Sequence, residues 1–300
     1  WFNQFNEYQK TEILDGIKKG LDVSIYAKPE YVGFQMLQIR LGLEENLDVS
    51  IYANSYFSEY QMQEIREGLK ANLDVSIYAN SEFDEFQMEE IREGLKKNVD
   101  VSIYAKLEFS SEQMEQIRLG LEANLDVSIY ANKDFYSNQM KEIRWGLEAN
   151  VDVSIYTKTE FDFLQMGEIR LGLQDDLDVS IYAKSDFNSN QMEEIRIGLL
   201  NRIDVSIYAK SDFDFSQMKE IRIALEQGLN NMLDYVDKDY NYKQMYIIRK
   251  GLEKNIDISV YAKPEYNPSQ MDQIRFGLLY DLDISIYAKP EFDGPEMKQI

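Results

Sequence analysis

The sequence predicts an all-α solenoid, a superhelix of about eleven 26-residue units. The first observation is periodicity: Gln-Met pairs recur every 26 residues from Gln35 to Gln217, and the period resumes at Gln244 after one extra residue. The second is that each copy carries the signature of one amphipathic helix, and the third is a shorter motif, LDVSIYA, that follows it. Repeat proteins grow by stacking such units on their neighbours rather than by enlarging one core.

The start of each helix is marked by a capping box. In the copy that begins at Phe57, Ser58 is followed three residues later by Gln61, so the hydroxyl can cap an early N–H while the amide reaches back. Phe57 before the cap and Met62 after it form a hydrophobic staple. We therefore assign Gln61 a structural role in preference to a functional ladder of amides.

The body and end of the helix follow from spacing. Met62, Ile65 and Leu69 lie on one helical face because they are spaced i, i+3, i+7. Asn72 then precedes an apolar residue, which is typical of the left-handed position that closes a helix. These signals predict a helix over residues 59–71.

The motif LDVSIYA allows two interpretations. Asp74 is a good N-cap for a short α or 3-10 helix, with Val75 and Tyr78 turned inward. Alternatively, Val75 and Ile77 could alternate in a short strand, which would give an α/β solenoid. We favour the helix, since Asp recurs in this place in nearly every copy and suits a cap better than a strand interior.

Two further recurring residues have structural explanations. Gly68 lies inside the helix, where glycine costs ~1 kcal/mol relative to alanine. The simplest reason is close approach by a neighbouring unit, through a ring such as Tyr78. Arg66 recurs along the chain and suggests a ladder of ion pairs with the Asp74 series, in preference to a phosphate site. The residues assigned structural roles are Gln61, Met62, Ile65, Arg66, Gly68, Leu69, Asp74 and Tyr78.

We expect residues 1–300 to form a single repeat solenoid. Degenerate copies at Gln9 and Glu296 give partial units at both ends, and these ends look cut, as in an excerpt of a longer chain. The extra residue lies at 229–235 and is either a kink between two runs of repeats or drift without consequence. No targeting signal is visible, and the cytoplasm is the compartment we favour.

A resemblance can be named from the string QMxxIRxGLxxNxDVSxYA, which covers nearly the whole chain. It resembles tandem repeats in uncharacterised proteins of anaerobic Gram-positive bacteria, some of them encoded on mobile elements. The alternation of one α-helix with a shorter helical segment is also similar to leucine-rich-variant solenoids. These resemblances imply an α/3-10 architecture and no particular activity.

The variable positions indicate where binding could occur. The position of Glu67 projects away from the core face and carries large apolar residues in most copies. We take six of them as candidate protein-binding residues: Leu119, Trp145, Leu171, Ile197, Ile223 and Phe276. The position of Tyr60 adds Phe34, Phe86 and Leu164. Such a stripe is either a protein interface or a face buried by a second layer or by further domains.

Composition limits the remaining function classes. The formal net charge of −22 disfavours direct binding to nucleic acid or anionic membranes, and no apolar run is long enough to span a bilayer. Histidine and cysteine are absent, and no catalytic motif is present. A calcium loop at 237–248 is rejected, since Tyr242 and Ile248 occupy its glycine and glutamate positions.

We therefore expect a non-enzymatic acidic scaffold that binds another protein and needs no cofactor or metal. One alternative is a phosphate or DNA mimic that inhibits a nucleic-acid-binding host enzyme. A net charge of −22 over eleven or so units at ~10 Å each is sparser than the charge on duplex DNA, at one per ~1.7 Å. A third possibility is an enzyme whose catalytic domain lies outside this sequence.

Overall fold

The computed structural model describes residues 1–236 and 239–299. Within these residues every regular element is an α-helix or a 3-10 helix, and none is a strand. Each α-helix from α1 to α11 is followed by one short 3-10 helix, and within each unit neighbouring α-helices contact each other in series. The predicted all-α solenoid of repeated units is confirmed, and the α/β alternative is wrong.

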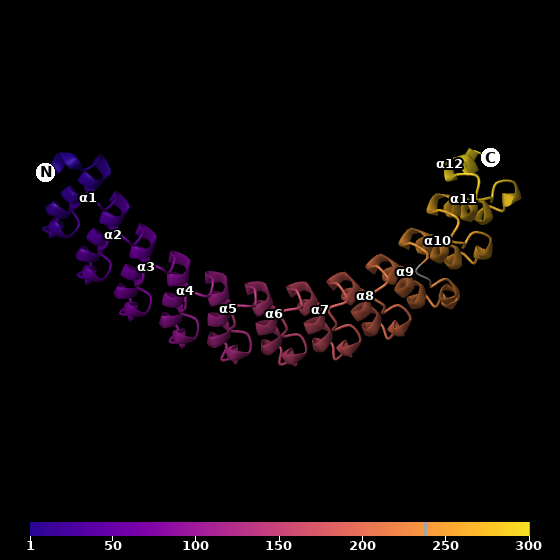
Figure 1. The fold of residues 1–300 in the computed structure, drawn as a ribbon, viewed down its shortest axis with the longest axis horizontal. Helices are drawn as coiled ribbons and strands as arrows, with labels where there is room; N and C mark the ends of the chain where they lie inside the picture. Colours follow the sequence, from indigo (N-terminus) through magenta and orange to yellow (C-terminus); the bar gives the residue numbers. More distant parts are fainter. Residues whose placement is uncertain (237–238, 300) are drawn as a thin grey trace. The chain divides into compact units, whose positions relative to one another are not determined.

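The chain divides into two compact units, Trp1–Glu148 and Ala149–Ile300. In each unit the α-helices lie side by side in chain order (Figure 1). The first unit contains η1 (Phe2–Gln4), α1 (Glu7–Lys18), η2 (Val23–Ile25), α2 (Gly33–Glu44), η3 (Val49–Ile51), α3 (Glu59–Lys70), η4 (Val75–Ile77), α4 (Glu85–Lys96), η5 (Val101–Ile103), α5 (Ser111–Glu122), η6 (Val127–Ile129) and α6 (Ser137–Glu148). The second contains η7 (Val153–Ile155), α7 (Phe163–Gln174), η8 (Val179–Ile181), α8 (Ser189–Leu200), η9 (Val205–Ile207), α9 (Phe215–Glu226), η10 (Asn230–Tyr235), α10 (Tyr242–Glu253), η11 (Ile258–Val260), α11 (Pro268–Leu279), η12 (Ile284–Ile286) and α12 (Gly294–Gln299).

The helix start contains the predicted capping box. The Gln61 N–H donates to Ser58 Oγ at 3.1 Å, and the Ser58 N–H donates to Gln61 Oε1 at 2.7 Å. The same glutamine then donates from Nε2 to the carbonyl of Phe83, one repeat further along, at 2.5 Å. Equivalent bonds join Gln87 to Phe109 and Gln191 to Phe213. The glutamine therefore caps its own helix and connects it to the next repeat.

The helix end is a Schellman motif. Asn72 adopts a φ of 54°, and the N–H groups of Asn72 and Leu73 donate to the carbonyls of Leu69 and Gly68. The predicted end at Asn72 is therefore present, and the helix itself stops at Lys70. Arg202 takes the same left-handed conformation, with a φ of 59°. The C-terminal motif thus forms even where the side chain is a poor match for it.

The 3-10 helix closes the repeat. The carboxylate of Asp74 accepts from the N–H of Ser76 at 3.1 Å and from its hydroxyl at 2.5 Å. This cap turns Val75 and Tyr78 inward, and both side chains are buried. The short helix that we favoured for LDVSIYA is confirmed, with Asp74 as its N-cap.

Gly68 is required by the tyrosine of its own repeat. The Tyr78 hydroxyl donates to the carbonyl of Glu64, and a Cβ on Gly68 would lie 1.9 Å from that hydroxyl oxygen. The close approach that we expected is present, but it comes from within the repeat and not from a neighbouring unit. Where Ala224 replaces the glycine, Tyr235 is not buried and Met232 is. Alanine therefore occurs where the buried tyrosine is missing.

The extra residue at 229–235 is absorbed in η10, which is longer than the other 3-10 helices of the repeats. The connections on either side persist. Gln217 Nε2 still donates to the carbonyl of Tyr240 at 2.6 Å, and Arg249 Nε still donates to Glu220 at 2.7 Å. The helices α9 and α10 contact each other as other neighbours do. The insertion therefore changes the loop and leaves the stacking of these two helices in place.

The Gly–Tyr contact predicts a steric defect with a specific rescue. In Gly120→Ala the new Cβ would lie 1.9 Å from Tyr130 Oη and 2.8 Å from Val127 Cγ1, so we expect a loss of at least ~1–3 kcal/mol in unfolding free energy. Adding Tyr130→Phe removes the hydroxyl and should recover most of this loss. Urea unfolding of the two single variants and the double variant measures the coupling.

Tyr130→Phe alone should cost only about 1 kcal/mol, since it removes one hydrogen bond to the Gln116 carbonyl. Strictly additive losses in the double variant would contradict the contact as the reason for glycine.

The buried tyrosines predict unfolding at alkaline pH. Burial raises the pKa of Tyr26 to about 12, and it raises the pKa of Tyr52 and Tyr78 in the same direction. Because the unfolded chain loses these protons at about pH 10, their stabilising contribution is full below that pH. It is lost as pH rises through the folded-state pKa.

We expect helical circular dichroism to fall in step with tyrosinate absorbance above pH about 10. Complete ionisation of all tyrosines with the helical signal intact would contradict this expectation.

Candidate functional site

The six candidate binding residues lie at equivalent positions on their α-helices. Leu119 and Trp145 lie on α5 and α6 in the first unit. Leu171, Ile197, Ile223 and Phe276 lie on α7, α8, α9 and α11 in the second. Five of them are half-buried, and Phe276 is exposed. The five half-buried residues are thus neither core residues nor freely projecting side chains, and the described residues provide no second layer that buries any of the six.

Local contacts organise two of these side chains. The ammonium of Lys141 lies 4.5 Å from the ring centroid of Trp145, which is within cation–π range. The rings of Phe276 and Tyr280 lie 4.6 Å apart in a tilted arrangement. These two candidate side chains are therefore partly ordered by their neighbours. Protein interfaces likewise combine aromatic residues with a polar rim.

A more exposed apolar feature lies about two helical turns nearer the N-termini of the α-helices in the first unit. We call it the aromatic ridge: Tyr8, Phe34, Tyr60 and Phe86, one from each of α1 to α4. Their exposed fractions are 44%, 53%, 58% and 60%. The rings of Tyr8 and Phe34 lie 4.9 Å apart. Sequence reasoning identified three of these residues and missed Tyr8, because its copy lacks the Gln-Met pair that marks the register.

An acidic groove continues the ridge between α4 and α5. It has a volume of about 340 Å³ and is lined by Phe86, Glu89, Glu90, Ser111, Glu112 and Glu115. Glu90 accepts from Arg118 Nε at 2.8 Å; burial raises the pKa of this carboxyl, and the arginine opposes that shift. Within the part of the chain that is described, Glu89, Glu112 and Glu115 form no ion pair. The groove therefore has an aromatic wall and carboxylates without a countercharge.

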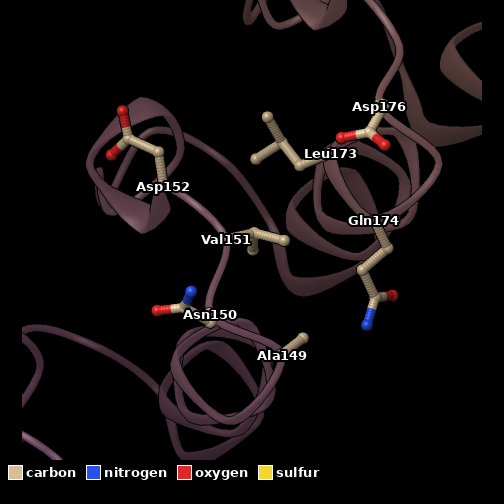
Figure 2. Close-up of a pocket in the computed structure, with 7 residues that line it drawn as sticks. All are labelled: Ala149, Asn150, Val151, Asp152, Leu173, Gln174 and Asp176. Atoms are coloured by element: carbon tan, nitrogen blue, oxygen red, sulfur yellow. The ribbon is translucent and has the colours of Figure 1, made fainter.

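Other cavities recur with the repeat. One, of about 520 Å³, lies in the second unit between residues 149–152 and the end of α7, and is lined by Asn150, Asp152 and Gln174 among others. Figure 2 shows that Gln174 points away from Asn150 and Asp152, so the polar groups do not converge. A second cavity, of about 530 Å³, occupies the equivalent place beside Asn255 and Asp257. A cavity that reappears with the repeat follows from stacking and gives no sign of a dedicated site.

The arginine row is occupied by the preceding repeat. Arg92 Nε donates to Glu64 at 2.7 Å, and Arg66 Nε donates to Gln38 at 3.1 Å. The expected pairing with the Asp74 series is wrong, since Asp74 caps its own 3-10 helix. The partner instead lies at the Glu64 position of the repeat before. These buried guanidinium groups therefore hydrogen-bond to the preceding repeat and help hold neighbouring repeats together.

Among the described arginines, Arg275 lacks an acceptor in the preceding repeat. Ile247 occupies the acceptor position before Arg275, and Arg275 turns to Asp272 on its own helix, with Nη2 at 2.6 Å from the carboxylate. The recurring Glu or Gln at this position was therefore a signal that could have identified the partner from sequence.

Among the described residues, no group of three or more acidic side chains is arranged to hold a metal ion. None of the α-helices described is long and apolar enough to cross a membrane.

The arginine ladder predicts unequal effects at its two ends. Arg92→Met leaves Glu64, whose side chain is 13% exposed, without its guanidinium, so we expect a loss of ~3–5 kcal/mol in unfolding free energy. Glu64→Gln should be mild, because Gln38 and Gln116 already accept from the next arginine. Urea unfolding measures both variants.

Lys70→Met is the control, since Lys70 forms an exposed ion pair with Glu45, and its unfolding midpoint should hardly move. Equal losses in Arg92→Met and Glu64→Gln would contradict a buried ion pair as the basis of the ladder.

Comparison with known proteins found no matching family model, no similar curated protein and no similar solved structure. The 26-residue repeat is therefore characterised by its own geometry: the capping glutamine, the Gly–Tyr contact and the arginine ladder. The aromatic ridge and the acidic groove of the first unit lie outside this framework, as do the candidate apolar residues of each unit, and these are the candidate surfaces.

Proposed function

We propose that the chain is a non-enzymatic acidic repeat scaffold that binds another protein through the outward faces of its α-helices. The observation that carries this proposal is the aromatic ridge: four consecutive helices place a large ring at the same position, each 44–60% exposed. Contiguous exposed apolar surface on a folded chain is typical of interaction sites, and aromatic residues are enriched in binding hot spots.

The framework supports the same proposal. Capping, core and ladder positions hardly change between repeats, and each has a structural partner. The outward positions change from repeat to repeat, as in Glu67, Leu119 and Trp145. Side chains can vary there without altering the fold, because the capping, core and ladder contacts are made from other positions of the repeat. Repeat proteins use such surfaces to bind partners.

The phosphate-mimic alternative needs free acids on one continuous face. Many of the acids are engaged elsewhere: Asp48, Asp74 and Asp100 cap 3-10 helices, and Glu64 accepts from the arginine ladder. This favours the protein-binding scaffold. The resemblance to tandem repeats of anaerobic Gram-positive bacteria is part of the proposal and adds no activity to it.

The proposal predicts selective loss of binding. Partners captured by the 300-residue chain are identified by mass spectrometry, purified, and titrated against variants. Trp145→Ala and Leu171→Ala should each weaken binding by ~2 kcal/mol or more if they are hot spots. Because both side chains are half-buried, thermal stability should change little.

Tyr56→Ala is the control, since this ring is 81% exposed and lies on the loop before α3 instead of on an α-helix. A large drop in melting temperature for Trp145→Ala would show that this side chain is part of the core and not of a binding surface. Binding that survives both helix variants but is lost on acid-to-amide changes would favour the phosphate mimic.

A further inference from the structure

We infer that the outward face of α1–α5 in the first unit binds a basic polypeptide segment that also carries apolar side chains. This inference rests on the proposed function and specifies its partner class. The aromatic ridge would take the apolar side chains, and the acidic groove would take an arginine or lysine side chain. Two adjoining features of one face therefore select one kind of partner.

The apolar half of the site is the ridge itself. Tyr60 and Phe86 are 58% and 60% exposed, although each lies one residue before a buried glutamine and two before a buried methionine. Nothing in the capping box or the core requires an aromatic residue at this position, since Asn138, Asn190 and Ser269 occupy it in other repeats. The rings are therefore available to a partner.

The charged half of the site is the acidic groove. Its carboxylates from Glu89, Glu112 and Glu115 surround a cavity of about 340 Å³ whose wall includes the ring of Phe86. Carboxylates attract a cation, and an aromatic face adds a cation–π contact when a guanidinium or ammonium stacks on it. A basic side chain satisfies both requirements, whereas a phosphate or a carboxylate would be repelled.

The residues that line the acidic groove are not repeated throughout the chain. The equivalent place between α8 and α9 holds Asn190 instead of Phe86 and Lys219 instead of Glu115. The aromatic wall and the uncompensated carboxylates therefore occur together between α4 and α5 and are not imposed by the repeat. This coincidence favours a basic segment over non-specific attraction of cations.

The repeat also suits a periodic partner. Packed helices lie ~8–10 Å apart. Seven residues of an α-helix advance about 10.5 Å, and the three residues of one polyproline II turn advance about 9 Å. In both conformations the side chain returns to nearly the same face after that interval. A segment with apolar residues at either interval can therefore place one on each ring of the ridge, with its basic residue in the groove next to Phe86.

The test uses the 300-residue chain and fluorescent synthetic peptides. One probe is a heptad peptide of leucine and arginine, the second has glutamate in place of arginine, and the third has serine in place of leucine. Fluorescence anisotropy at ~0.15 M salt measures the affinities. We expect the first peptide to bind more tightly than the third by about tenfold or more, and the glutamate peptide not to bind.

Variants locate the binding. The triple variant Glu89→Gln, Glu112→Gln, Glu115→Gln should weaken binding of the arginine–leucine peptide about tenfold or more. Phe86→Ala should weaken it about fivefold or more. The control Glu160→Gln, Asp186→Asn, Asp212→Asn removes the same number of charges from exposed loops and should change affinity less than about twofold.

Several results would overturn the inference. Equal losses of affinity in the two triple variants would indicate non-specific attraction. Equal affinities for the arginine and glutamate peptides would exclude a preference for a basic partner. Absence of binding by the arginine–leucine peptide would also reject it. If the captured partner still depends on Trp145 and Leu171 in that case, the proposed function stands and only the basic partner class fails. Circular dichroism of each variant checks that the fold is retained.

Discussion

The rest of the structure depends on one buried amide. Gln61 accepts from the Ser58 N–H through Oε1 and donates to the Phe83 carbonyl through Nε2. One side chain thus fixes both the start of its helix and the position of the next repeat. Losing it would leave a buried backbone group unsatisfied, at a cost of ~1–3 kcal/mol. Glutamate can accept the cap hydrogen bond, as Glu296 does for Asp293, but it cannot donate to a carbonyl. This explains why an amide recurs here.

Interactions local in sequence could be predicted, and those that cross repeats could not. The capping box, the helix end at Asn72 and the 3-10 helix after Asp74 each depend on a few neighbouring residues, and the structure contains all three. The second bond of Gln61 spans 22 residues and the Arg92–Glu64 pair spans 28. Their partners depend on how far each repeat is rotated against the next. A repeat string fixes the period but not that rotation, so the arginine was matched with the wrong carboxylate.

The exposed residues of the candidate site could be predicted where helical spacing alone decides which side chains face outward. The spacing from Met62 identified the outward positions, including Phe34, Tyr60 and Phe86. It could not show that most residues at the Glu67 position are half-buried, because spacing along one helix says nothing of its contacts with the rest of the fold. The acidic groove was also out of reach, since its walls come from residues on two helices that are brought together only by stacking.

The framework does not explain the charge of the groove. Like charges brought close together destabilise a fold, and native proteins usually pair them or move them apart. Glu64 and Glu90 have arginine partners within the stack, whereas Glu89, Glu112 and Glu115 have none among the described residues. The equivalent groove between α8 and α9 contains Lys219, so the repeat tolerates a compensating charge at this place. Mutual repulsion between α4 and α5 is therefore a cost that stacking does not require, and a cation from a partner would relieve it.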